Sequence, residues 1–155
     1  MQNNFKNIEF LKNFTTHDYE YFLKLPPLTP FSEEIIAYLN ALSKEINKDL
    51  RIQEFPDVRT FSFFCRKANL LLLRKKNFDS GVVKLGRGLV FHIAPSNVPV
   101  NFAYSLMISL LSGNSNIVRV PSKKFGQTDI IVNAINKLAQ VSQHSHISNR
   151  IILVS

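Results

Sequence analysis

The sequence predicts an α/β protein in which amino-terminal helices precede the first half of a doubly wound, parallel, Rossmann-like sheet. Two patterns indicate this class: apolar residues recur at helical spacing up to about residue 80, and short apolar runs then alternate with helix-length amphipathic segments. We therefore expect a helical region over 1–80 and a Rossmann-like region over 81–155. With 155 residues, 45% apolar and 19% charged, the chain can bury a core and is not a disordered tail.

The helical region is expected to contain three helices. A short one is predicted near 18–24, after which three prolines break the chain. Ser32 is a suitable N-cap for a helix over 32–48, because acids follow it and apolar residues recur at helical spacing. Pro56 opens a helix over 56–73 that is apolar on nearly all sides at its end, which predicts deep burial or a missing partner surface.

The second region changes to strands separated by helices. The run Leu89–Ile93 is nearly continuously apolar between glycine and proline, which is typical of a strand buried on both faces. Helix-length crossovers imply parallel strands. The last strand ends without a helix to cover one of its faces, so we expect an incomplete sheet. The expected strands are 82–85, 89–93, 116–120 and 151–154, and the expected helices are 101–111 and 127–140.

The charge predicts an anionic partner without naming it. Nineteen basic and eleven acidic residues give a net charge of +8. The basic residues form no continuous stripe, which makes nucleic-acid binding the weakest hypothesis. No apolar run reaches the roughly 18 residues of a membrane span, and residues 1–6 lack the pattern of a secretory signal, so the cytoplasm is the default location.

Few side chains suggest metal or thiol chemistry. Cys65 is the only cysteine, which excludes an internal disulfide and a cysteine-rich zinc site, and it lies in an apolar helical pattern as a small buried residue does. His144 and His146 could bind a metal, but a polar loop is the simpler interpretation. His92 is interpreted as a hydrogen-bonded core residue. We therefore expect no metal site.

Two loops follow strands where parallel sheets bind ligands, beyond the carboxyl ends. In 94–99, Pro95 and Pro99 stiffen the segment around Asn97, whose amide N–H could stabilise an oxyanion. The alternative is that Asn97 only caps the next helix or completes the turn. The loop lacks the glycines of the usual dinucleotide fingerprint.

The loop over 121–124 is basic. Residues 115–128 contain no Asp or Glu but do contain Arg119, Lys123 and Lys124. Sites for NAD often place a carboxylate here, whereas sites for NADP place a cation against the 2′-phosphate. A nucleotide site here would favour NADP(H), and the alternative is an ordinary solvated basic loop.

The stretches Leu85–Pro99 and Leu110–Ser122 resemble acyl-CoA reductases of the LuxC type, within the aldehyde dehydrogenase superfamily. Phe55–Val58 and Phe64–Leu70 resemble the same family, so the similarity covers about 50–155.

The resemblance implies roles for single residues. Asn97 matches the asparagine that holds the thioester or aldehyde oxygen, and Arg119 matches a lysine that contacts the adenosine ribose. Ser122 stands where members that prefer NAD often have a glutamate, which agrees with NADPH as cofactor. The implied cofactor-binding residues are Pro95, Ser96, Arg119, Pro121, Ser122 and Lys123.

The implied function is reduction of a fatty acyl-CoA or acyl-protein thioester to an aldehyde by an NADPH-dependent oxidoreductase. The family's nucleophilic cysteine lies downstream, so we expect this chain to be the cofactor-binding amino-terminal portion, inactive without a carboxy-terminal part. Homo-oligomerisation stays open. The alternative from another class is a non-catalytic module that binds a nucleotide or acyl-CoA. A third and weaker hypothesis is a basic nucleic-acid-binding domain.

Overall fold

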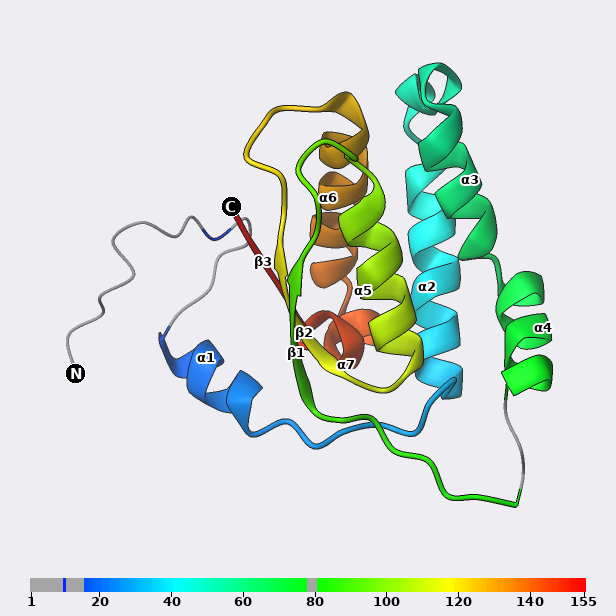
Figure 1. Ribbon diagram of the computed structural model, residues 1–155, viewed down its shortest axis with the longest axis vertical. Coiled ribbons are helices and arrows are strands. Elements are labelled where there is room, and N and C mark those ends of the chain that lie inside the picture. Colours follow the sequence, from blue (N-terminus) through cyan, green and yellow to red (C-terminus); the bar gives the residue numbers. More distant parts are fainter. Residues whose placement is uncertain (1–9, 11–15, 78–80) are drawn as a thin grey trace.

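Parallel strands and helices alternate in the carboxy-terminal half of the molecule, as the α/β prediction requires (Figure 1). A computed structural model describes residues 10, 16–77 and 81–155. The expected boundary between residues 80 and 81 adjoins 78–80, which lie outside the described residues. In chain order the elements are α1 Thr16–Leu23, α2 Glu33–Ile46, η1 Leu50–Glu54, α3 Pro56–Phe64, α4 Lys67–Asn77, β1 Leu89–Ile93, α5 Asn101–Leu111, β2 Ser115–Arg119, α6 Gly126–Ala139, η2 Ser142–His144, α7 Ser145–Ser148 and β3 Ile151–Val154.

The three strands form one parallel sheet in the order β1-β2-β3. The helices α5 and α6 are the crossovers, because each connects the carboxyl end of one strand to the amino end of the next. At the carboxyl end, Ile93 pairs with Arg119, and Arg119 pairs with Val154. The segments that leave β1 and β2 therefore start side by side.

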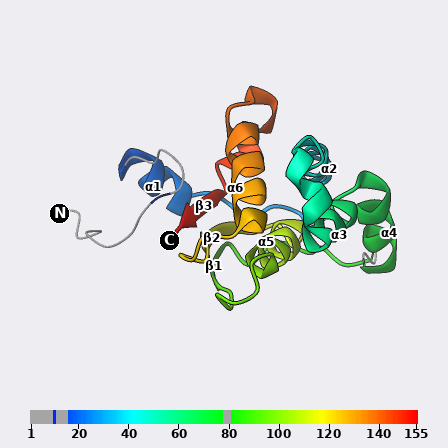
Figure 2. The ribbon, with the colours of Figure 1, turned by 90° about the horizontal axis from the view of Figure 1, so that it is seen from above.

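The helices are distributed unequally over the two sides of the sheet (Figure 2). On one side, here called the inner face, α5 and α6 cover the sheet, with α2 and α3 behind them and α4 outermost. On the other side, the outer face, α1 lies next to β3. The main core lies on the inner face, where Val118 and Leu153 are buried.

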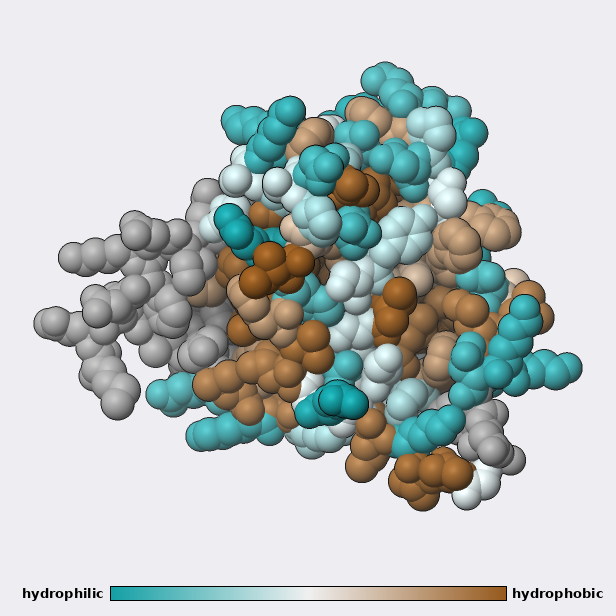
Figure 3. Space-filling view, in the orientation of Figure 1, coloured by the Kyte–Doolittle hydropathy of each residue, from teal (hydrophilic) through white to brown (hydrophobic). Residues whose placement is uncertain are grey.

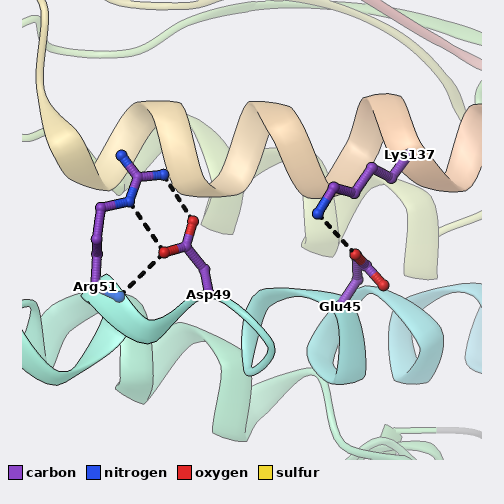
Figure 4. A network of polar contacts seen from close by, with 4 residues as sticks. All are labelled: Glu45, Asp49, Arg51 and Lys137. Carbon is purple, nitrogen blue, oxygen red and sulfur yellow. Dashed lines mark hydrogen bonds and ion pairs between the residues drawn. The ribbon is translucent and has the colours of Figure 1, made fainter.

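The helix α2 forms the centre of the inner helical layers. The Ser32 hydroxyl accepts a hydrogen bond from the Ile35 N–H at 3.4 Å and caps the first turn, as predicted. At its other end Lys137 of α6 lies 3.1 Å from Glu45, and next to it Arg51 pairs with Asp49 at 2.6 Å (Figure 4). Because these pairs are partly exposed, each contributes little stability beside the buried apolar stripe of α2.

One predicted helix of the amino-terminal region is wrong in detail. The helix expected over 56–73 is interrupted at Cys65 and Arg66, and α4 starts where the Lys67 N–H donates to the Asn40 side chain at 3.0 Å. Its end is not deeply buried on all sides, because Leu72 is 59% exposed. Of the aromatics before Cys65, Phe61 is buried, whereas the following two phenylalanines are exposed.

The expected strand at 82–85 does not form. An apolar run becomes a strand only with a backbone partner, and this segment has no sheet pairing. Val82 and Val83 are 58% and 91% exposed. Directly after the segment, the Gly86 N–H donates to the Leu28 carbonyl at 3.0 Å rather than to a strand.

The predicted burial of the strands also needs correction. Leu89, Phe91 and Ile93 are 47%, 57% and 70% exposed, because β1 is an edge strand and none of the described helices covers its outer face. The face of β3 that was expected to be bare is instead buried. Its residues Ile152 and Val154 pack with Phe22 of α1 and with Phe10 and Leu25.

Three chain segments meet at the amino end of the sheet, and we call this contact the junction. Leu28 donates its N–H to the Gly113 carbonyl at 2.8 Å and accepts from Gly86 at 3.0 Å. A Cβ on Gly113 would lie 2.1 Å from the Leu28 oxygen, and one on Gly86 would lie 2.3 Å from the Gly113 oxygen. The segments come this close only because both residues are glycines. The Arg87 N–H adds a bond to the Asn114 side chain at 2.6 Å.

Within the described ranges, none of the helices has both the length and the apolar character that crossing a membrane requires.

Candidate functional site

The loop after β1 is held in place at both ends. The Val98 N–H points to the Pro95 carbonyl at 3.5 Å, which closes a turn with Ser96 and Asn97 at its corners. On the α5 side, the Thr128 hydroxyl of α6 donates to the Pro99 carbonyl at 3.3 Å. The loop is therefore closed by its own turn and tied to α6, and the turn holds Asn97 at the surface.

Asn97 is exposed and makes no hydrogen bond through its side chain with any residue that the structure describes. The N-cap position of α5 is Val100, and no side chain caps this helix. The alternative in which Asn97 caps the following helix is therefore wrong, whereas its place at a corner of the turn agrees with the other alternative, that it completes the turn. Its amide is free to donate to a bound oxygen.

The loop after β2 exposes its cations. The Arg119 side chain lies on the outer face of the sheet, because residues alternate along a strand and Val118 points into the inner core. Ser122 and Lys123 are exposed, and the Lys123 ammonium lies 5.2 Å from the centre of the Phe125 ring. Among the described residues Arg119 has no ion pair.

The predicted site residues lie along one edge of the sheet. Because Ile93 and Arg119 pair across the strands, the loops that contain Asn97 and Ser122 leave adjacent strands at the same level. The helices α5 and α6 begin directly after these loops, so both helix dipoles point their positive ends to this edge. Pro95 and Ser96 lie in the first loop and Pro121 and Lys123 in the second, all at this edge.

Two further side chains at this edge were not predicted. Phe91 and Ile93 are exposed on the outer face, the face that also carries Arg119. A cation beside an apolar shelf fits a nucleotide, since the cation can bind a phosphate and the shelf can pack against an adenine ring. The continuous apolar run around them contained no periodic signal that could have shown this exposure.

A buried polar chain supports the strands beneath the loops. His92 Nδ1 lies 2.7 Å from the Ser105 hydroxyl of α5, and His92 Nε2 lies 3.0 Å from Asn116 Oδ1 of β2. The Asn116 amide donates in turn to the Asn114 carbonyl at 2.9 Å. His92 is thus the hydrogen-bonded core histidine that the sequence predicts, and it joins β1, β2 and α5.

Cys65 is buried, as predicted, and burial raises the pKa of its thiol to about 12. Its sulfur lies 3.5 Å from that of Met107. At neutral pH the thiol therefore stays protonated and cannot act as a nucleophile.

His144 and His146 have structural contacts. His144 packs edge-on against Tyr38, with ring centres 5.9 Å apart, and His146 Nδ1 lies 2.5 Å from Glu34 Oε2. No cluster of potential metal ligands occurs among the residues that the structure describes.

Comparison with known proteins identifies the family. The family model described as Acyl-CoA reductase (LuxC) matches residues 6–154, which is nearly the whole chain. Neither the curated proteins nor the solved structures contain a match. The family match confirms the resemblance of the two loop segments, and the family's reaction class is the reduction of an acyl substrate. The chain belongs to the LuxC family of acyl-CoA reductases.

Proposed function

We propose that this chain is the cofactor-binding amino-terminal part of a cytoplasmic, NADPH-dependent reductase that converts a fatty acyl thioester to an aldehyde. The observation that supports the proposal is the pairing of Ile93 with Arg119. It aligns the two loops predicted to bind ligand at the carboxyl edge of a parallel sheet, beside an exposed arginine that has no ion pair among the described residues. In this proposal the helices of 1–80 support the nucleotide-binding region of 81–155.

In this proposal the residues at this edge have different roles in binding the cofactor. Arg119 binds the 2′-phosphate, and Lys123 adds positive charge nearby. The loop contains no Asp or Glu, so no carboxylate repels the phosphate. Pro95 and Ser96 shape the first loop, and Pro121 and Ser122 shape the second. NADPH, when bound, supplies the hydride.

Asn97 acts on the acyl substrate. Its amide donates a hydrogen bond to the thioester oxygen as negative charge develops there. The nucleophilic thiolate that this chemistry needs is not Cys65, whose pKa of about 12 keeps it protonated. We propose that a carboxy-terminal part of the enzyme supplies it and covers the apolar outer face of β1.

The role of Arg119 is tested by its selectivity between cofactors. Arg119→Ala should weaken NADPH binding about tenfold and change NADH binding much less, because only NADPH carries the 2′-phosphate. Titration of the chain with NADPH, NADH, 2′,5′-ADP and 5′-AMP measures this. Lys44→Ala, an exposed cation on α2, is the matched control. Equal weakening of both cofactors would remove the 2′-phosphate role.

The role of Asn97 is tested by turnover. In the complete reductase Asn97→Ala should lower kcat about 100-fold or more and leave KM nearly unchanged, because the hydrogen bond strengthens mainly in the transition state. Asn133→Ala, an exposed asparagine on α6, is the control. A normal kcat in Asn97→Ala would exclude the oxyanion role.

A non-catalytic module is the second candidate, and the inert thiol of Cys65 favours it. The two candidates differ in whether adding a cysteine-bearing partner produces reductase activity. Under the reductase proposal, adding the carboxy-terminal part of the enzyme yields acyl-CoA-dependent oxidation of NADPH. A module would bind the nucleotide or acyl-CoA equally well and gain no activity.

A further inference from the structure

A groove runs along the amino-terminal edge of the sheet, opposite the proposed cofactor loops. Its first part is a cavity of about 690 Å³ between the start of α2 and the last turns of α4. Its second part, of about 420 Å³, borders Gly86 and Arg87 before β1 and Ser112 and Asn114 before β2. Both parts are lined by Pro30 and Phe31, so the two cavities adjoin at these residues.

The groove has an apolar floor and a rigid base. Phe31 and Leu71 are only partly exposed and pack against the main core. The Phe31 N–H donates to the Leu111 carbonyl at 2.8 Å, and its φ of 54° is strained for a bulky residue. The junction of Leu28, Gly86 and Gly113 holds the second part. Such strain persists only where the surroundings impose the conformation, so the groove is shaped before any partner binds.

The rim of the groove is positively charged. Arg74 and Lys75 line the first part, and Lys84 and Arg87 line the second. Among the lining residues that the structure describes, Glu33 is the one acid, and it is paired with Arg74 at 2.6 Å. In the described part of the chain none of the other three cations has an ion pair. In Figure 3 hydrophilic side chains border apolar ones on the right, where α4 lies in Figure 1.

We propose that this groove docks an acidic amphipathic helix of a partner protein. Apolar side chains of such a helix would enter over Phe31 and Leu71, and its carboxylates would face Lys75 and Arg87. A flat anionic membrane fits less well, because the apolar floor is recessed. The inference does not depend on the proposed function, since the groove and the cofactor loops lie at opposite ends of the strands.

The test uses an 18-residue amphipathic helical peptide with leucine on one face and glutamate on the other. Its binding to the chain, followed by fluorescence anisotropy, should weaken about tenfold in Lys75→Glu/Arg87→Glu, because both unpaired cations are reversed. The control Lys24→Glu/Lys44→Glu changes net charge equally at exposed sites outside the groove and should bind normally. Circular dichroism melting checks that both variants are folded.

Two further comparisons can overturn the proposal without any protein variant. A peptide with glutamine in place of glutamate should bind at least about tenfold more weakly, and the glutamate peptide should lose affinity as salt rises. Equal binding of the two peptides would exclude charge complementarity. Equal binding of the two double variants would place the peptide elsewhere. Binding to anionic phospholipid vesicles but not to the peptide would assign the groove to a lipid surface instead.

Discussion

Gly113 and Gly88 both have a positive φ, 87° and 102°, but only Gly113 is crowded. The Leu28 oxygen lies 2.1 Å from where a Cβ of Gly113 would be, whereas nothing lies within 4 Å of the corresponding position at Gly88. Gly113→Ala should therefore lower the free energy of unfolding by about 3 kcal/mol or more, because the junction must open. Gly88→Ala should cost only about 1 kcal/mol of backbone strain.

Urea denaturation of both variants measures this difference, and Gly88→Ala is the matched control for strain alone. Equal losses would mean that the backbone relaxes around Gly113 without cost. At this scale the sequence shows where these glycines stand along the chain. It could not show that Gly86 and Gly113 are in contact, because that contact depends on how segments far apart in the sequence come together in the fold.

The strand β1 exposes apolar side chains on its outer face. Figure 3 shows apolar side chains gathered where β1 lies in Figure 1. We expect the isolated chain to self-associate through this face, since Phe91 and Ile93 are 57% and 70% exposed. Phe91→Thr should reduce association without lowering the melting temperature.

Val118 lies on the inner face of β2 and is fully buried. Val118→Thr should instead lower the free energy of unfolding by about 1–3 kcal/mol, because the new hydroxyl lacks a hydrogen-bond partner.

Light scattering over a concentration series and thermal melting separate the two effects. A monodisperse wild-type chain would contradict the prediction. The apolar run between glycine and proline identified β1 as a strand with the bounds that the structure shows. It could not distinguish a strand buried on both faces from one that lies at an edge, because a continuous apolar run fits both.

The molecule as a whole has one continuous main core. Buried residues of the amino-terminal helices, such as Phe61, belong to the same cluster as Val118 of β2 and Ile131 of α6. We therefore expect helices and sheet to unfold in one transition at low micromolar concentration. Circular dichroism follows the helices, and reaction of Cys65 with a thiol reagent reports opening of the core, since its folded pKa of about 12 suppresses the thiolate.

The two probes should give the same urea midpoint. Labelling of Cys65 before the loss of helix would show that α3 opens separately, and Cys65→Ser supplies the blank for the reagent. At this scale two groups of cations lie at opposite edges of the sheet. Arg119 and Lys123 lie at the carboxyl edge, and the groove cations lie at the amino edge.

The sequence by itself determined the α/β class, the bounds of α5 and β3, the buried state of Cys65, the core role of His92 and the family. These properties depend on local periodicity, on residue type and on motifs of adjacent residues. Only the tertiary structure decided that 82–85 is not a strand, that α1 covers β3 and that β1 is exposed. It also placed the cations of α4 and Arg87 on two adjoining cavities. Each of these depends on which segments meet across a long separation in the chain, and pairing and burial are properties of both partners.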